Sequence, residues 1–254
     1  GDGDRNMVVG RGIVISPSDS LAVLAANARL VPWFRNGLPG VARSMPTSRA
    51  VDRVAIALGV DCYETPTGWK YFGSLLDAGH IALCGEESAG TGSNHIREKD
   101  GVWAVLFWLN VLAMRREPAA AILADHWRRY GRNFYARHDY EGLPTEAASR
   151  LIDGLRRRLP ALSQRRAGEF SILAADEFAY TDPVDGSITE RQGIRIELEG
   201  GSRIVFKVDA NALRDAMATD LRDDVYRIVK DGHVALRAFG TTNTSATRAT
   251  RAAI

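Results

Sequence analysis

The first half of the chain alternates short apolar runs with longer segments of helical periodicity. The apolar runs predict strands, or a hairpin in the first case, at residues 8–15, 40–45, 60–63 and 80–84. Apolar spacing predicts helices from Ser18 or Ser20 to Leu30, from Thr47 to Leu58, and over residues 69–78, 100–116 and 119–130. This alternation is typical of a doubly wound α/β domain with a mixed sheet, which we expect over residues 16–132.

The pattern changes after residue 132. A basic helix is predicted over residues 144–159, followed by strands at 170–173, 178–182, 193–198 and 202–208. The DG and GG pairs between these strands favour tight turns and an antiparallel sheet. Residues 133–254 are therefore expected to form a smaller α+β domain.

Charge and apolar run length exclude several classes of function. The chain has 33 basic and 31 acidic residues, a formal net charge of +2, which gives no global field for nucleic acid or an anionic membrane surface. The longest apolar run, residues 102–114, includes Asn110 and is shorter than a membrane span. Cys62 and Cys84 lack metal-ligand spacing, so we expect reduced core thiols in a cytoplasmic protein. The first residues, GDGDRNM, contain no initiator methionine, which suggests an upstream region.

Asp2 and Asp4 alternate with glycines at the start of the chain. Glycine lets a tight loop direct both carboxylates at one hard cation, and two carboxylates suit Mg²⁺. A calcium-binding EF-hand does not fit, because arginines occupy the positions that need Gly and Glu. Arg5 follows directly, where its guanidinium can hold a phosphoryl group beside the cation. The alternatives are a solvated acidic turn and a surface arginine that screens it.

The segment GEESAG, residues 85–90, follows a predicted strand. Ligands of open α/β sheets gather at the carboxyl ends of strands, and Glu86 and Ser88 can point the same way to bind neighbouring sugar hydroxyls. The start of a helix, with acidic residues in its first turn, would explain the same segment.

Three other segments carry candidate polar groups. HIREKDG offers Lys99 for a phosphate and His95 as a general-base candidate, although Asp100 can simply cap the next helix. TPTGWKYF places Thr67 and Trp69 on a constrained turn that can face a sugar ring, or else pack inward. RSMPTS, residues 43–48, stands at a strand-to-helix junction that suits an anion or ordinary capping.

Taken together, these motifs resemble one known family. In order, they are GDGDRNM, SPSDS, RSMPTS, YETPTGWKYFG, LCGEESAGTGSNHIREKDGVWAVLFWL, DHWRRYGRNFYARHDYE and FAYTDPVDGSITERQGIRIELEGGSRIVF. They resemble the phosphoglucomutases of the α-D-phosphohexomutase superfamily over residues 1–206, after which the sequence diverges. GEES and REKDG favour the branch that handles glucose over those that handle mannose or glucosamine.

The resemblance implies an isomerase that interconverts glucose 1-phosphate and glucose 6-phosphate through a phosphoserine enzyme and glucose 1,6-bisphosphate. Residues 1–15 would be the tail of a preceding α/β domain, with Asp2 and Asp4 as two of three Mg²⁺ ligands. The implied substrate contacts are Asp4, Arg5, Thr67, Glu86, Ser88, Lys99 and, near a hinge between domains, Arg137. The expected partners are small sugar phosphates, with no nucleic acid or membrane, and the expected state is a monomer.

Two departures from the family pattern limit this expectation. The Thr-Ala-Ser-His-Asn type segment that carries the phosphoserine is absent, so this chain alone is expected to be inactive. The Arg-x-Ser-Gly-Thr phosphate loop is also absent after SRIVF, and only GTTNTSATRA at residues 240–249 has a similar composition. The alternatives are a non-catalytic paralogue or remnant that binds sugar phosphates, and a mutase for another phosphohexose.

Overall fold

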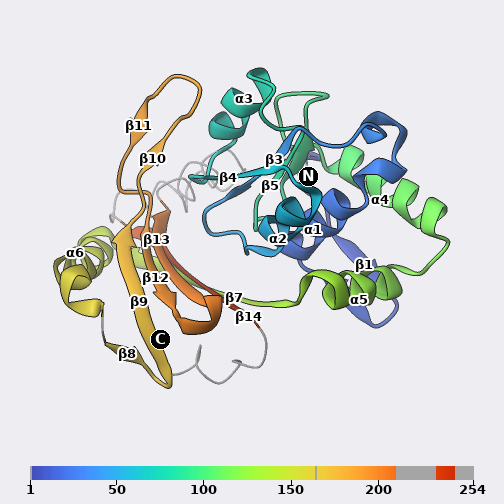
Figure 1. Ribbon diagram of the computed structural model, residues 1–254. Helices are drawn as coiled ribbons and strands as arrows, with labels where there is room; N and C mark the ends of the chain where they lie inside the picture. Colours follow the sequence, from blue (N-terminus) through green and yellow to red (C-terminus); the bar gives the residue numbers. More distant parts are fainter. Residues whose placement is uncertain (1, 164, 210–232, 244–254) are drawn as a thin grey trace. The chain divides into compact units, whose positions relative to one another are not determined.

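The structure, a computed structural model, describes residues 2–163, 165–209 and 233–243 (Figure 1). The chain divides into two compact units. The first consists of Gly1–Asn133 with Tyr180–Ile188, and the second of Phe134–Ala179 with Thr189–Ile254. Each unit has its own sheet and core.

The first unit alternates strands and helices along the chain. Its strands are β1 (Val8–Gly10), β2 (Ile13–Ile15), β3 (Gly40–Ser44), β4 (Asp61–Thr65), β5 (Leu83–Gly85) and β6 (Thr91–Ser93). Its helices are α1 (Pro17–Ala26), α2 (Ala50–Leu58), α3 (Trp69–Asp77), α4 (Gly101–Arg115) and α5 (Ala119–Tyr130), with short 3-10 turns η1 (Ala28–Leu30) and η2 (Pro32–Phe34). β1 and β2 form the hairpin that the sequence allowed.

The central sheet of this unit has the order β4-β3-β5-β6. β3 runs parallel to both β4 and β5, and β6 is antiparallel to β5, so the sheet is mixed as predicted. Successive residues of a strand face opposite sides. Val41 and Leu83 pack into the core formed with α1, α2, α4 and α5, whereas Ala42 and Cys84 pack against α3. Helices therefore cover both faces, which confirms the α/β class.

The sequence placed two helix starts wrongly. α1 is capped by Ser16, whose Oγ accepts a hydrogen bond from the Asp19 amide, rather than by Ser18 or Ser20. The N-cap residue of α2 is Arg49, without a side-chain bond, rather than Thr47. The side chains of the predicted caps of α1 make tertiary contacts instead. Ser20 Oγ, for example, accepts a hydrogen bond from the Trp108 indole at 2.8 Å.

In the part that the structure describes, the second unit contains an antiparallel sheet covered by helix α6. Its elements are β7 (Asn133–Pro144), α6 (Thr145–Leu162), β8 (Arg166–Ala167), β9 (Phe170–Glu177), β12 (Ile194–Leu198), η3 (Glu199–Gly201), β13 (Arg203–Asp209) and β14 (His233–Asn243). The sheet order is β7-β14-β13-β12-β9-β8. Ile152, Leu155 and Leu159 of α6 pack on Ile194 and Ile204 of the sheet. The antiparallel α+β prediction is confirmed, but the sequence did not predict β7 or β14.

Between β9 and β12 the chain forms a small hairpin, β10 (Tyr180–Thr181) with β11 (Ile188–Thr189), whose residues 180–188 belong to the first unit. There the Tyr180 ring meets Tyr71 of α3 edge-on, with ring centroids 5.5 Å apart. The sequence predicted a longer strand at this place.

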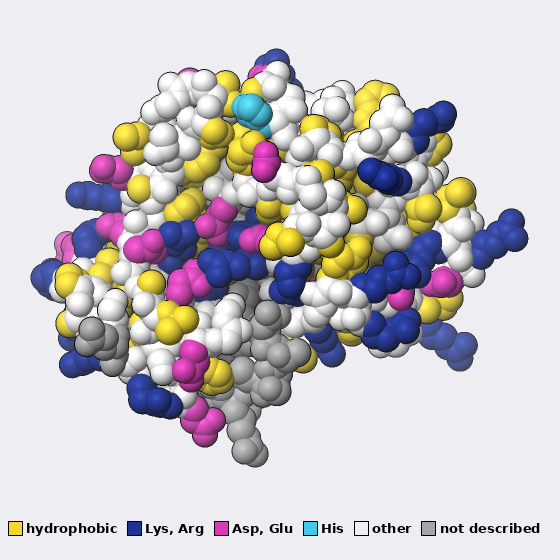
Figure 2. All heavy atoms as spheres, viewed as in Figure 1, with side chains coloured by type: hydrophobic (Ala, Val, Ile, Leu, Met, Phe, Trp, Pro, Cys, Tyr) yellow, Lys and Arg dark blue, Asp and Glu magenta, His cyan; other side chains and the backbone are white. Residues whose placement is uncertain are grey.

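Three whole-chain expectations can be compared with the described residues. Their helices include none that is long and apolar enough to cross a membrane. Cys62 and Cys84 are both free, as predicted. Basic and acidic side chains are interspersed on the face shown in Figure 2, in keeping with the near-zero net charge.

Candidate functional site

The acidic N-terminal loop lies against the loop between β5 and β6. The guanidinium of Arg5 donates through Nε to Asp4 Oδ2 at 3.0 Å and through Nη1 to the carbonyl oxygen of Ser88 at 2.7 Å. The amide of Asn6 donates to the carbonyl oxygen of Ala89 at 3.2 Å. Two motifs more than 80 residues apart in sequence thus share hydrogen bonds at one place.

The backbone at this contact has little room to vary. Ala89 has a φ of +72°, in the left-handed region that residues other than glycine seldom adopt. A Cβ on Gly101 would lie 2.2 Å from the carbonyl oxygen of Arg5 and 2.6 Å from that of Gly3. The amide of Gly101 instead donates to Gly3 O at 2.8 Å, so only glycine lets the acidic loop approach α4 this closely.

Lys99 reaches the same loop from the N-terminal side of α4. Its Nζ lies 3.5 Å from Asp4 Oδ2 and 6.0 Å from the centre of the Trp69 ring. Burial disfavours ionisation of Asp4, but the hydrogen bonds of Arg5 and Asp2 and the charges of Arg5 and Lys99 outweigh it, so the pKa of Asp4 is lowered. Asp4 is therefore held ionised between two cations.

Glu86 is buried, and its carboxylate has a single backbone donor. Its Oε1 accepts from the Gly68 amide at 3.1 Å, which connects the GEES loop to the turn that carries Thr67. Burial, and then the charge of Glu87, raise the pKa of Glu86. The Thr67 hydroxyl is buried and has no partner among the described residues. The GEES loop and the turn that carries Thr67 are therefore neighbours, and a buried carboxylate and a buried hydroxyl lie on these two loops.

Two predicted metal ligands lie in the acidic loop. Asp2 is exposed and Asp4 half-buried. Within the described ranges, no three His, Cys, Asp or Glu side chains are grouped so as to hold a metal ion. Proteins commonly hold Mg²⁺ with one or two carboxylates together with substrate phosphates, and the role of Asp2 and Asp4 as its ligands stays a prediction.

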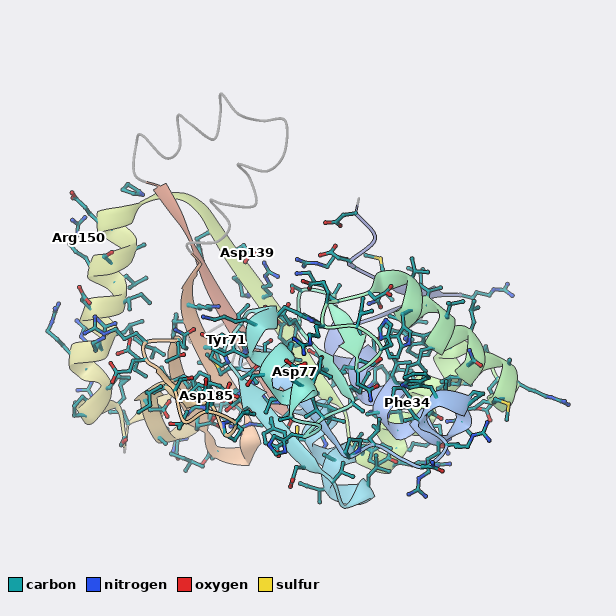
Figure 3. All side chains as sticks on the ribbon, turned by 90° about the horizontal axis from the view of Figure 1, so that it is seen from above. Phe34, Tyr71, Asp77, Asp139, Arg150 and Asp185 are labelled. Carbon is teal, nitrogen blue, oxygen red and sulfur yellow. The ribbon has the colours of Figure 1, made fainter. Side chains whose placement is uncertain are left out.

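Arg137 lies in the second unit, on β7. Its Nε forms an ion pair of 2.9 Å with Asp139, which is labelled in Figure 3. The other candidates, Asp2 to Lys99, all lie in the first unit. A substrate role for Arg137 stays a prediction.

Sequence analysis missed Glu87. Its buried carboxylate accepts from Ser44 Oγ at 2.9 Å and Thr47 Oγ1 at 3.3 Å, and its amide donates to Thr47 Oγ1 at 2.9 Å. The RSMPTS junction, which suits either an anion or ordinary capping, thus holds the protein's own carboxylate. The signal was available, because two adjacent glutamates on a loop that follows a strand cannot both face a ligand when side chains alternate.

Comparison with known families agrees with this architecture. The α/β/α domain III of phosphoglucomutase/phosphomannomutase matches residues 17–130, and the C-terminal domain of phosphoglucomutase-1 matches residues 132–219. Residues 210–219 of the second match lie outside the described ranges. The two matches show that the chain belongs to the phosphoglucomutase/phosphomannomutase family.

Within that family, several curated relatives of this chain are named phosphoglucomutase. The Rhizobium radiobacter phosphoglucomutase is 57% identical over 85% of this chain, and human phosphoglucomutase-1 is 49% identical over 93%. The crystal structure of Paramecium pp63/parafusin, described as an exocytosis-sensitive phosphoprotein and phosphoglucomutase in its open form, superimposes with a TM-score of 0.80 at 42% identity over 99% of this chain. The chain spans 40%, 44% and 42% of these three proteins, respectively.

Proposed function

We propose that this chain supplies the sugar-recognition part and two metal ligands of a phosphoglucomutase that interconverts glucose 1-phosphate and glucose 6-phosphate. The observation that carries the proposal is the convergence of Asp4, Arg5 and Lys99 with the GEES loop. The 57% identity to a protein named phosphoglucomutase supports the reaction type.

The cations and the hydroxyl-binding groups would have separate tasks. Arg5 and Lys99 would bind a phosphoryl group beside the acidic loop, since guanidinium and ammonium groups are the usual hydrogen-bond donors to phosphate oxygens. Asp2 and Asp4 would hold Mg²⁺, which offsets charge on the transferring phosphoryl group. Glu86, Ser88 and Thr67 would bind the sugar hydroxyls and so orient either O1 or O6 toward the phosphoryl donor.

In the family, that donor is a phosphoserine, which gives its phosphoryl group to the sugar and recovers the other phosphate of glucose 1,6-bisphosphate. The seryl O–P bond breaks as the sugar O–P bond forms, and the second half-reaction reverses this at the other end of the sugar. No segment of this chain matches the phosphoserine motif. The proposed activity therefore belongs to a longer protein that contains this chain, with cytoplasmic location and a monomeric state as further expectations.

A chimera tests this proposal. The part of the Rhizobium radiobacter phosphoglucomutase that precedes the matched region is fused to this chain, and conversion of glucose 1-phosphate is measured with Mg²⁺. We expect turnover by the chimera and none by the chain alone. A folded chimera without turnover, in an assay where the intact relative is active, would contradict the proposal.

Two substitutions in the chimera test the assigned roles. Glu86→Gln is expected to lower kcat/KM by roughly 100-fold, because a carboxylate that accepts hydrogen bonds from sugar hydroxyls becomes an amide in a buried site. The control Glu117→Gln removes an exposed carboxylate that pairs with Arg115, at the end of α4 remote from Asp100, and should leave kcat/KM unchanged. Equal effects of the two substitutions would exclude a specific role for Glu86.

A further inference from the structure

His95 lies on residues 94–100, which join β6 to α4 and include Lys99. Both nitrogens of its ring have a partner. Nδ1 is 2.6 Å from Ser93 Oγ, and Nε2 is 3.1 Å from Asp100 Oδ2. The ring also stacks on Trp103, with centroids 4.8 Å apart and planes inclined by 14°. The imidazole therefore bridges the two ends of the segment.

The chemistry of the partners fixes the tautomer. The Asp100 carboxylate can only accept, so Nε2 carries the hydrogen. In the neutral ring Nδ1 then accepts, and the Ser93 hydroxyl donates to it. Serine, histidine and aspartate in this order are also found in hydrolases. Here the serine side chain has 0% exposure, so no substrate atom can reach its oxygen and the set cannot act as a nucleophile.

Asp100 is held at three points. Its Oδ1 accepts from the Trp103 amide at 2.8 Å and so caps α4, its amide donates to Thr91 O at 2.9 Å, and its Oδ2 meets His95. Lys99 is the preceding residue, and its direction follows from the backbone at Asp100. Its stem is confined as well, because a Cβ on Gly90 would lie 3.2 Å from Lys99 Cδ.

We propose that His95 is a positioning residue for Lys99. Its ring ties Ser93 to Asp100 and so holds the Lys99 ammonium beside Asp4, where a phosphoryl group of the sugar phosphate would bind. The identity of that ligand rests on the proposed function, whereas the bridge itself rests on the contacts of His95. This role differs from that of the general-base candidate considered from the sequence.

The bridge can be tested without any turnover. Nitrogen-15 NMR of the His95 ring in the intact chain, above pH 7.5, should show a protonated Nε2 and an unprotonated Nδ1, and the Ser93→Ala variant should shift the Nδ1 resonance. A ring with the hydrogen on Nδ1, or an Nδ1 resonance indifferent to Ser93→Ala, would overturn the bridge.

The effect on Lys99 is tested by a double-mutant cycle in the chimera described above. His95→Gln should raise KM for glucose 1-phosphate about tenfold and change kcat less than about threefold, because Lys99 would bind phosphate in both the ground and transition states. In a Lys99→Met background the same substitution should have no further effect on KM. Additive effects would show that His95 acts independently of Lys99 and would overturn the proposal.

Two further variants separate positioning from general destabilisation. Arg97→Gln changes the same segment at an arginine whose side chain is 73% exposed and pairs with Asp77, and should leave KM unchanged. Ser93→Ala keeps the ring but removes one partner, so a smaller rise in KM is expected. A lowered melting temperature in His95→Gln without any rise in KM would assign His95 a purely structural role. Absence of turnover by the parent chimera would contradict the proposed function instead, and the NMR measurement would then decide the bridge.

Discussion

Arg43, on β3, is almost completely buried and faces two carboxylates. Its Nε and Nη2 bind Asp52 at 2.5 and 2.6 Å, and its Nη1 binds Glu64 at 2.7 Å. Burial opposes the charge, but these bonds outweigh it and raise the pKa of Arg43. The cluster joins β3, β4 and α2.

Removing this arginine should destabilise the first unit. Arg43→Met is expected to lower the free energy of unfolding by about 3 kcal/mol, since both carboxylates lose the arginine's charge and hydrogen bonds while partly buried. All five tryptophans lie within residues 33–127, so tryptophan fluorescence in denaturant reports on the first unit. Arg97→Met breaks an exposed pair and should cost less than about 1 kcal/mol. Similar losses for both would contradict the buried-cluster account.

His126, on α5, is a second buried group with a predictable consequence. Neither ring nitrogen has a hydrogen-bond partner among the described residues. Burial, and then the charge of Arg53, lower the pKa of His126 to about 4. The charge of Asp125 acts in the opposite direction but is outweighed. Because the folded state binds its proton less tightly than the unfolded state, stability is lost as pH falls from about 6.5 to about 4.

The free energy of unfolding of the first unit should therefore fall by about 2 kcal/mol more between pH 7 and pH 4.5 in the native sequence than in His126→Phe. Denaturant unfolding followed by tryptophan fluorescence at the two pH values provides the comparison. An equal pH dependence in the two proteins would show that His126 does not titrate as a buried neutral group.

The close approach at Gly101 gives another residue-scale prediction. Gly101→Ala places a methyl group against the backbone of Arg5 and Gly3, so turnover by the chimera should fall at least tenfold as the acidic loop moves. Gly73, inside α3, has open space at the Cβ position, so Gly73→Ala should instead stabilise the unit by about 0.5–1 kcal/mol. Unchanged turnover in Gly101→Ala would contradict the packing described here.

Single residues also show where sequence reasoning stopped. Asp4, Arg5, Glu86 and Lys99 could be singled out by residue type and spacing, and by their likeness to a family. Their mutual contacts could not be predicted from the sequence, because the hydrogen bond from Arg5 to the carbonyl oxygen of Ser88 joins positions 83 residues apart. The role of Glu87 depends in the same way on where Ser44 and Thr47 lie in the folded unit.

Helix starts and two strands of the second unit, β7 and β14, are the elements that the sequence placed least well. Ser18 and Ser20 were the predicted caps of α1, but tertiary contacts occupy both side chains, and Ser16, which the prediction did not include, is the cap. Ser18 Oγ accepts from the Ser48 amide and Ser20 Oγ from Trp108, which leaves Ser16 for the helix. β7 was missed because NFYARHDYEGLP lacks an alternation of apolar and polar residues, and β14 because it pairs with a strand more than twenty positions away.

This assignment predicts how α1 responds to substitution. Ser16→Ala should lower the free energy of unfolding by about 1 kcal/mol, since the Asp19 amide loses its acceptor, while Ser16→Asp should be nearly neutral. Ser18→Ala and Ser20→Ala would test tertiary bonds instead. Denaturant unfolding of the Ser16 variants is the measurement, and a neutral Ser16→Ala would reopen the choice of cap.

Over the whole molecule, the order of elements was largely predictable. Alternating strands and helices indicated the α/β unit, and the later strands with tight turns indicated the antiparallel unit. The sequence did not predict that residues 180–188 belong to the first unit. Their place depends on packing contacts such as that of Tyr180 with Tyr71. In the first unit, Phe34 packs among Trp103 and Phe107 on α4, where Figure 3 shows crowded side chains.

The central claim is that this chain contains a recognition site for glucose phosphates. The most direct test is the ratio of kcat/KM for glucose 1-phosphate to kcat/KM for mannose 1-phosphate in the chimera, because the two sugars differ only in the configuration of one hydroxyl. If the GEES loop and Thr67 bind the sugar hydroxyls as proposed, this ratio should exceed about 100 in the parent chimera. In the Glu86→Gln variant of the chimera, the ratio should fall toward one. A preference for mannose 1-phosphate, or a ratio indifferent to Glu86→Gln, would contradict the account.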